Sequence, residues 1–210
     1  MNYLTEEEQV ERLRAWWKEY GLAVVSGIVI AIIIVLVWHY YTAYEARKSQ
    51  AASLIYTTLV NSDLSEQPES AHQAAKELVK HYAGTPYASY AALWLAKQSV
   101  VNQQYPKAIN WLNWVVANGK VKAVKQVARL RLAQINLQLN QPTQALQILA
   151  TVEDKAYLGL IDETRGDAFL LANNISAAKT AYEQALQEMP EPDRVQPILA
   201  MKLANLPTSN

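Results

Sequence analysis

The sequence predicts an all-α protein with a single membrane-spanning helix near the N-terminus, followed by an array of paired helices. Three observations support this fold class. Residues 21–37 form an uncharged apolar segment, and small residues recur at fixed intervals further along the chain. No stretch alternates polar and apolar residues in the way of a half-buried strand. The 210-residue chain is expected to divide into a short segment 1–20, a transmembrane anchor 21–41 and a helical domain 45–210.

The anchor is long enough to cross a bilayer. Residues 21–41 contain no Lys, Arg, Asp or Glu, and as a helix with a rise of about 1.5 Å per residue they span about 31 Å, the thickness of a hydrocarbon core. Aromatic residues of the kind found at membrane interfaces flank both ends: Trp16, Trp17, Tyr20, Trp38, Tyr40, Tyr41 and Tyr44. A cleaved signal peptide is not expected, because the leading segment is acidic and no small-residue cleavage site follows.

Residues 1–20 are expected to form a short amphipathic helix at the cytoplasmic membrane surface, with Thr5 and Glu8 as a capping box. Three basic residues precede the anchor and two follow it closely. This small excess favours a cytoplasmic N-terminus and a C-terminal domain outside the cytoplasm. Neither glycine nor proline interrupts residues 28–67, so one helix is expected to continue from the anchor to about Asn61.

The remainder of the chain shows a repeated spacing of small residues. A small residue is followed by another twelve positions later, and then by two residues four and seven positions further on. Three successive sets match: Ala96, Ala108, Leu112 and Val115; Ala133, Ala145, Leu149 and Val152; Gly166, Ala178, Tyr182 and Ala185, with Phe169 and Pro190 also in place. This spacing is typical of tetratricopeptide repeats, in which paired helices of about 34 residues meet over small side chains.

Further elements complete the predicted array. Residues 51–81 are interpreted as a degenerate first pair, and Val195–Leu206 as the terminal helix that covers the last apolar face. Prolines that can occupy the first position of a helix, and breaks between helices, fall in the gaps: Pro86, Pro106, Pro142, Gly84, Gly119, Asn173 and Asn174.

Charge is unevenly distributed along the domain. Residues 78–152 contain eight bases and no acid, whereas residues 153–210 contain nine acids and five bases. The basic part is either an ordinary solvated surface or a face for an acidic partner or anionic lipid headgroups, with Lys122 and Lys125 as its candidate residues. A nucleic acid partner is not expected, because no basic run is dense enough. The absence of cysteine excludes disulfides and thiol catalysis.

The sequence contains no recognisable catalytic or metal-binding motif. The histidines His39, His72 and His81 have no ligand spacing. Asp162 and Glu163 are adjacent, so on a helix their side chains diverge by about 100°, which suits solvent better than an acid–base pair. The sequence therefore predicts no enzyme, no cofactor and no small-molecule substrate.

The aromatic residues of the first complete repeat are candidates for a partner surface. Trp94 falls in the first helix of that pair, Trp111 and Trp114 fall in the second, and Tyr87 and Tyr90 flank them. These residues either fill the core of one repeat or line a groove in which tryptophan anchors a partner.

The anchor carries a second candidate contact. Ala23, Gly27 and Ala31 recur every four residues. Such a ridge of small residues lets another transmembrane helix pack closely, although glycine and alanine are also ordinary constituents of membrane helices.

The order of these parts resembles one protein family. An acidic leader and an anchor ending in WHYY precede AASLIYTTLV, YAGTPYASYAALWLAK, LRLAQINLQL, RGDAFLLANN and a terminal MKLANL. This layout resembles the YfgM family, the ancillary subunits of the bacterial SecYEG translocon. The resemblance implies a bacterial inner-membrane protein with a periplasmic tetratricopeptide-like domain, associated with SecYEG and with the membrane-anchored periplasmic chaperone PpiD. The implied function is a non-enzymatic scaffold that links exported proteins to periplasmic chaperones. The alternative is an adaptor of the same fold in envelope-stress regulation or a division complex.

Overall fold

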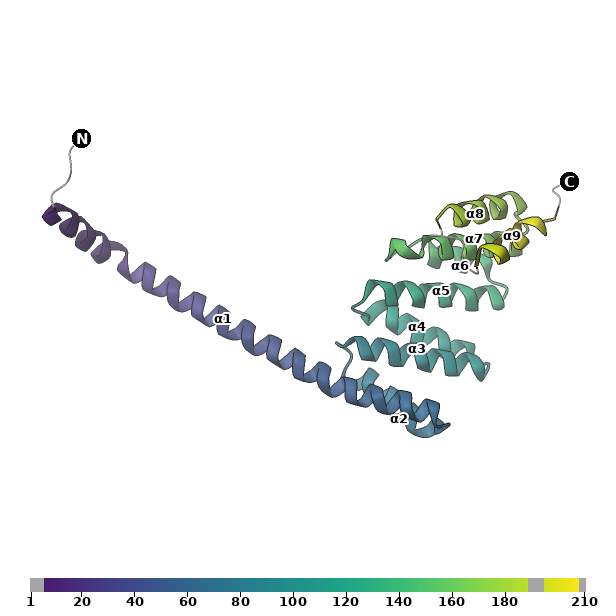
Figure 1. The fold of residues 1–210 in the computed structure, drawn as a ribbon, viewed down its shortest axis with the longest axis horizontal. Coiled ribbons are helices and arrows are strands. Elements are labelled where there is room, and N and C mark those ends of the chain that lie inside the picture. Colours follow the sequence, from purple (N-terminus) through teal and green to yellow (C-terminus); the bar gives the residue numbers. More distant parts are fainter. Residues whose placement is uncertain (1–5, 189–194, 208–210) are drawn as a thin grey trace. The chain divides into compact units, whose positions relative to one another are not determined.

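The computed structural model describes residues 6–188 and 195–207, and the chain divides into two compact units, Met1–Lys48 and Ser49–Asn210. The first long helix, α1, covers Glu6–Leu64 (Figure 1). The helix therefore has no break between the predicted leader and the anchor, and it continues past Asn61. The predicted capping residue Thr5 lies outside the described residues.

Helix α1 has the length and composition of a membrane span. Among the helices that the structure describes, it alone meets that requirement, and only 6% of its most apolar window is buried. Its apolar side chains, such as Ile33 and Leu36, are more than half exposed. Exposed apolar surface of this extent needs an apolar environment, which a bilayer supplies.

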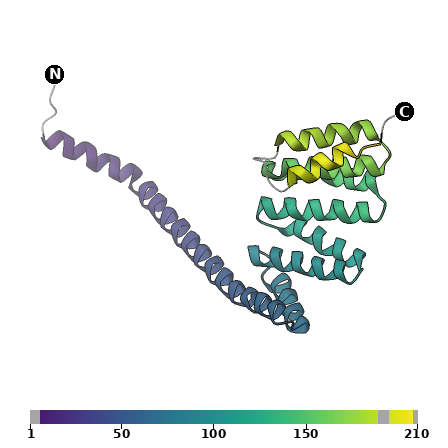
Figure 2. The same cartoon turned by 45° about the vertical axis from the view of Figure 1, so that its right-hand side comes forward.

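The second unit consists of short helices stacked in chain order (Figures 1 and 2). No strand occurs in residues 6–188 or 195–207, and the all-α prediction is confirmed. Its helices after the end of α1 are α2 Pro68–His81, α3 Pro86–Val101, α4 Tyr105–Asn118, α5 Lys122–Gln138, α6 Pro142–Leu149, α7 Leu158–Leu171, α8 Ile175–Glu188 and α9 Val195–Ala204, with a 3-10 turn η1 at Lys155–Tyr157.

Proline marks the start of four of these helices. Pro68, Pro86 and Pro142 are the first residues of α2, α3 and α6. A backbone N–H at this position makes no hydrogen bond within the helix, so proline, which lacks the N–H, costs nothing there. Pro106 was predicted at the same place but is the second residue of its helix, because α4 begins at Tyr105. The second position is equally free of an intrahelical hydrogen bond, so the difference has no energetic consequence.

Four helix pairs close with the same turn. One residue in each turn has a positive φ of 54° to 59°: Glu66, Gln103, Asn140 and Asn173. In each case the N–H of the following residue donates to the carbonyl five residues back at 2.8 to 2.9 Å, which is the Schellman arrangement that satisfies the end of a helix. The turns lie 37, 37 and 33 residues apart, so the repeated unit extends over four pairs.

The predicted small residues lie in the interiors of the pairs. Ala96 of α3 and Ala108 of α4 are at most 2% exposed, and Ala133 of α5 and Ala145 of α6 are completely buried. Because these side chains end at Cβ, the two helices of a pair can approach closely. The same register holds one repeat earlier, where Leu59 of α1 is followed twelve residues later by the buried Ala71 of α2.

The pair α7–α8 has a glycine at the position of the first small residue. A Cβ added to Gly166 would overlap the ring of Tyr182. Tyr182 is completely buried, and its hydroxyl donates to Asp167 Oδ1 at 2.7 Å. Glycine at position 166 therefore makes room for a tyrosine whose hydroxyl is held at the edge of the core.

One predicted position does not fit the pattern. Val152 was expected to complete the second set of repeat residues, but α6 ends at Leu149 and Val152 is 38% exposed. After Leu149 the chain leaves the helix and enters the 3-10 turn Lys155–Tyr157. The side chain of Asp154, which precedes this turn, accepts a hydrogen bond from the Ala156 N–H. Pro190, the last residue of the third predicted set, lies outside the described part of the chain.

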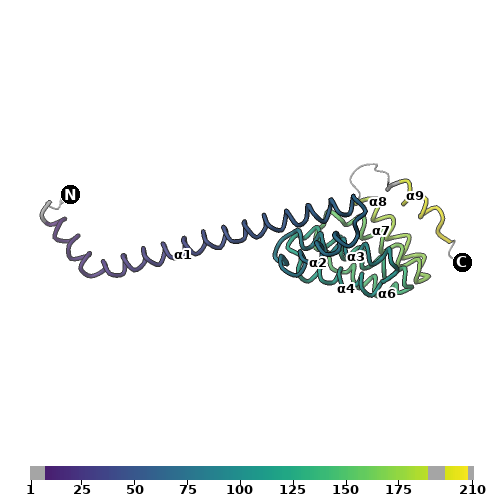
Figure 3. Tube along the Cα trace, turned by 90° about the horizontal axis from the view of Figure 1, so that it is seen from below, coloured from purple at the N-terminus to yellow at the C-terminus, as the bar shows by residue number. Residues whose placement is uncertain are grey.

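Helix α9 lies beside α7 and α8, the last described pair of the stack (Figure 3). Its Leu199 is completely buried in a small core with Ala178, Tyr182 and Ala185 of α8. The predicted terminal helix is confirmed, because α9 removes from water the apolar face that the last repeat would otherwise expose.

Candidate partner-binding surface

Two of the predicted tryptophans line a common pocket. We call it the tryptophan pocket, and its volume is about 550 Å³. It lies between α2, α3 and α4, and its walls include His72, Lys76, Trp94, Lys107 and Trp111. Both tryptophans are only partly buried and pack against the largest core cluster. Each ring therefore supports the core and also lines a cavity, while the binding of a partner there stays a prediction.

One residue that lines the tryptophan pocket has an unpaired hydrogen-bond donor. The Nε1 atom of Trp94 is buried and has no acceptor among the described residues. His72 meets the Trp94 ring edge-on, with 6.2 Å between the centroids. Burial lowers the pKa of His72 below its ordinary value, and the charge of Lys76 lowers it further. The pocket thus places two indole rings beside charged side chains, among them Glu69, Lys76 and Lys107.

Tyr87 and Tyr90 belong to a different aromatic group. Both contact Tyr56 of α1, with centroid distances of 5.5 and 5.9 Å. Burial raises the pKa of Tyr56. Trp114 is not part of this tyrosine group and does not line the tryptophan pocket. Its backbone carbonyl accepts a hydrogen bond from the Asn118 side chain at 3.0 Å. The predicted aromatic surface is therefore divided between separate places on α3 and α4.

The two predicted lysines differ in their surroundings. Lys122 is exposed, and no ion pair joins it to a residue that the structure describes. Lys125 instead lies 3.4 Å from Glu153, which also accepts from Arg129 at 3.0 Å. Part of the basic segment is thus neutralised by the first acid that follows it in the chain.

Glu153 ties the loop after α6 to α5. Its N–H donates to Oε1 of the completely buried Gln126 at 2.7 Å. The hydrogen bond from Arg129, outweighing partial burial, holds the pKa of Glu153 below its ordinary value, and Lys125 acts in the same direction.

This lowered pKa predicts a loss of stability in acid. Glu153 stabilises the fold above the pKa of the unfolded chain, about 4.5, and that contribution disappears as the pH falls through the lower folded pKa. The free energy of unfolding of the wild-type chain is expected to fall more steeply between about pH 5 and pH 3 than that of Glu153→Gln. Urea unfolding in nonionic detergent, followed by circular dichroism at several pH values, measures both slopes. Equal slopes would show that Glu153 is not linked to folding.

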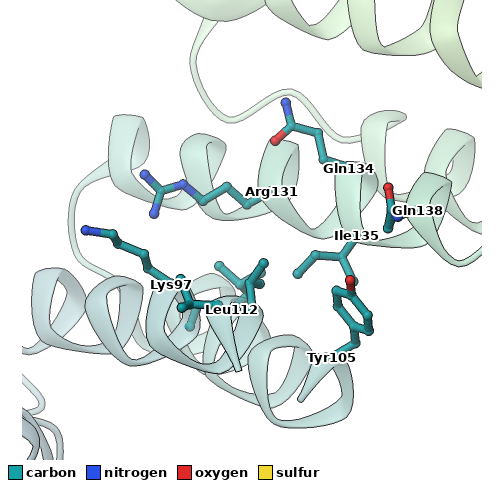
Figure 4. Close-up of a pocket in the computed structure, with 10 residues that line it drawn as sticks. Lys97, Tyr105, Leu112, Arg131, Gln134, Ile135 and Gln138 are labelled. Atoms are coloured by element: carbon teal, nitrogen blue, oxygen red, sulfur yellow. The ribbon is translucent and has the colours of Figure 1, made fainter. Parts of the chain in front are cut away.

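A second pocket was not predicted from the sequence. We call it the basic pocket, and its volume is about 470 Å³. It lies between α3, α4 and α5 (Figure 4), with walls formed by Ala96, Lys97, Val100, Val101, Tyr105, Leu112, Arg131, Gln134, Ile135 and Gln138. The sequence did contain a signal: Lys97 follows the small residue Ala96 by one position, and Arg131 precedes Ala133 by two. Aligning the repeats would have placed both cations on neighbouring first helices.

The expectation that Asp162 and Glu163 face solvent is wrong. Asp162 is 5% exposed and pairs with Arg165 at 2.7 Å. Glu163 accepts from Lys202 Nζ of α9 at 2.9 Å, and Asp167 accepts from the same atom at 2.8 Å. Asp162 is held by a cation three residues away and Glu163 by one 39 residues away, so the adjacency of the two acids did not indicate their environment.

The Lys202 contacts fasten α9 to the last repeat. Burial lowers the pKa of Lys202, but the hydrogen bonds to Asp167 and Glu163 outweigh it, and the net pKa is raised. Burial and the hydrogen bond to Asp167 raise the pKa of Tyr182. Neither pocket described above includes any of these groups, and within the described chain no cluster of His, Asp and Glu could hold a metal ion.

The small residues of the anchor lie on an open surface. Ala23, Gly27 and Ala31 are all exposed, and a Cβ added to Gly27 would meet no atom within 4 Å. Room for a neighbouring helix is therefore present at Gly27, while the packing of a partner there stays a prediction.

Comparison with known proteins identifies the family. Residues 14–208 match the tetratricopeptide repeat-like domain family. The ancillary SecYEG translocon subunit of Haemophilus influenzae is 30% identical over 208 residues, covering 98% of this chain and 100% of that protein. The proteins of the same name from Escherichia coli and Neisseria gonorrhoeae are 28% and 27% identical, and each alignment covers 97% of this chain and 98% of the relative. No solved structure matches the chain significantly. The chain therefore belongs to the YfgM family, that of the ancillary SecYEG translocon subunits, and it carries a tetratricopeptide repeat-like domain.

Proposed function

We propose that this protein is a non-enzymatic, membrane-anchored adaptor of the Sec translocon. The observation that carries the proposal is the similarity along nearly the whole chain to proteins named ancillary SecYEG translocon subunits. A repeat domain of paired helices suits this role, because stacked repeats present extended surfaces to partners. In the tryptophan pocket the Ser99 hydroxyl donates to the Leu95 carbonyl rather than to His72, and no cluster of His, Asp and Glu among the described residues could hold a metal ion.

The adaptor is proposed to sit in the bacterial inner membrane, with its repeat domain in the periplasm. The apolar part of α1 would cross the bilayer, and the small excess of basic residues before it supports a cytoplasmic N-terminus. The repeat domain would then bind the periplasmic chaperone PpiD and bring exported chains to it, as the family resemblance implies. The tryptophan pocket, where Trp94 and Trp111 lie beside basic side chains, is the surface we assign to such a partner.

The orientation predicts the behaviour of fusion proteins. A reporter that is active only outside the cytoplasm, fused after Asn210, is expected to be active in cells. A reporter that is active only in the cytoplasm should be inactive at the same position. The opposite pair of results would place the repeat domain in the cytoplasm and would rule out its contact with a periplasmic chaperone.

Association with the translocon is tested by purification in mild detergent. The wild-type chain is expected to co-purify with the Sec channel, and Gly27→Leu to recover less of it, because a large side chain on the ridge keeps a neighbouring helix at a distance. Leu22→Ile, on the exposed anchor surface but outside the ridge, is the matched control. Recovery of the channel by a chain whose anchor has been replaced with an unrelated span would assign the contact to the repeat domain. Failure of the wild-type chain to recover the channel would contradict the proposed function.

A further inference from the structure

The basic pocket, between α3, α4 and α5, has a chemistry that selects its ligand. We propose that it binds an extended polypeptide segment in which acidic side chains lie next to an apolar side chain. This inference rests on the adaptor function proposed above, and it names the kind of segment that the adaptor would hold.

The two cations of the basic pocket have no internal counter-charge. Lys97 and Arg131 are exposed, and neither forms an ion pair with a described residue. Helices α3 to α6 contain no Asp or Glu, and the nearest following acid, Glu153, is already held by Arg129 and Lys125. A pocket with two unpaired positive charges attracts an anion, and the planar guanidinium of arginine matches a carboxylate.

The cations lie beside apolar surface. In Figure 4 the charged ends of Lys97 and Arg131 point toward the same end of the pocket, while Tyr105 and Ile135 lie toward the other end. Leu112 is 1% exposed and belongs to the core, whereas Val101 is 66% exposed. An apolar ligand side chain that packs against Val101 would remove its own surface and that of Val101 from water. This burial is favourable in proportion to the apolar area buried.

The remaining wall carries amide groups. Gln134 and Gln138 are exposed side chains of α5 that line the pocket, and each can donate to and accept from a peptide backbone. The volume of about 470 Å³ is in the range of pockets that hold small ligands, so it fits a few residues of an extended chain rather than a folded surface. Carboxylate, apolar side chain and backbone amide together describe a polypeptide, while a lipid headgroup would leave the apolar wall and the amides unused.

The test uses the full chain in nonionic detergent and a short fluorescent peptide. The probe carries Asp-Leu-Glu in a Gly-Ser background with an amidated C-terminus, and binding is measured by fluorescence anisotropy. The wild-type chain is expected to bind this probe more tightly than either an Asn-Leu-Gln or an Asp-Ser-Glu version, and to bind it less tightly as salt is added. Freeing the C-terminal carboxylate should change the affinity little, because the acidic side chains supply the charge.

Substitutions assign the binding to the pocket. Lys97→Gln and Arg131→Gln are each expected to weaken binding by about three- to tenfold, in line with a hydrogen-bonded ion pair at a partly exposed site. Val101→Ser should also weaken binding, through lost apolar contact. Lys120→Gln is the matched control, because Lys120 is an exposed base of the same segment that does not line the pocket. All four positions are exposed, and unchanged circular dichroism would confirm that the variants fold.

Three results would overturn the inference. These are no binding of the acidic probe to the wild-type chain, equal binding of the Asn-Leu-Gln probe, and full binding by both cation variants. Binding of anionic lipid vesicles that depends on Lys97 and Arg131, in the absence of peptide binding, would identify a headgroup site instead. If the chain still co-purifies with the Sec channel while the peptide fails to bind, only this inference fails and the adaptor function stands.

Discussion

Replacing Gly166 with alanine is expected to destabilise the repeat domain by about 1–3 kcal/mol, through overpacking. The added methyl group would overlap the ring of Tyr182. Tyr182 cannot easily move aside, because it is completely buried and its hydroxyl is bonded to Asp167 at 2.7 Å. The expected sign is informative, since the same change within a helix free of such contacts would stabilise it by about 1 kcal/mol.

Thermal unfolding of the full chain in nonionic detergent, followed by circular dichroism, measures this effect. The matched control is Gly84→Ala, because an added Cβ at Gly84 meets nothing within 4 Å and its backbone does not have a positive φ. That variant should change stability by less than about 0.5 kcal/mol. A Gly166→Ala chain as stable as the control would mean that α7 and α8 do not meet over this glycine.

Leu199→Ala is expected to cost about 2–5 kcal/mol and to release α9, because truncating a buried leucine removes its contacts and leaves a cavity. Leu199 is completely buried among Ala178, Tyr182 and Ala185. Once α9 is released, Glu163 and Asp167 also lose their ion pairs with Lys202. Hydrogen exchange should then increase throughout α7 and α8, in addition to the shift in the melting temperature.

Ile198→Ala provides the comparison within the same helix. Ile198 precedes Leu199 by one residue but is 49% exposed, so its truncation leaves no enclosed cavity. Its effect on stability is expected to remain below about 1 kcal/mol. Equal effects at the two positions would contradict the packing of α9 on the last repeat.

The fold could be predicted because its determinants are local and periodic. A small residue such as Ala96 or Gly166 specifies a close approach between helices wherever it recurs at the right spacing, and proline at Pro86 or Pro142 specifies where a helix begins. The apolar anchor could also be predicted from the sequence, because its length and lack of charge are enough to indicate a membrane span. These signals require no knowledge of which residues meet across the fold.

The charged contacts could not be predicted in the same way. Glu163 pairs with Lys202, 39 residues away, and Glu153 with Arg129, 24 residues away. These separations follow from the stacking of the repeats, and no local pattern records them. The interpretation of Glu163 as solvent-facing failed for this reason, whereas Asp162 is buried by the packing of α7 and pairs with Arg165 on the same helix.

The candidate site was predictable in part. The sequence indicated Trp94 and Trp111, which do meet at one pocket, because large aromatic residues are conspicuous and their helices were correctly assigned. The basic pocket escaped because Lys97 and Arg131 are ordinary surface residues until α3 and α5 are placed beside each other.

The order of the stack has a consequence for how the chain is made. Among the described helices, every pair with substantial contact is separated by no more than one other helix, as for α3 with α5 and α5 with α7. A chain synthesised from its N-terminus can therefore complete each repeat as soon as the next one emerges, without waiting for a distant partner. Helix α9 follows these repeats in the chain and packs its Leu199 against α8. The apolar face of the last repeat therefore stays uncovered until α9 has been synthesised, and a chain that stopped before α9 would leave that face open to water.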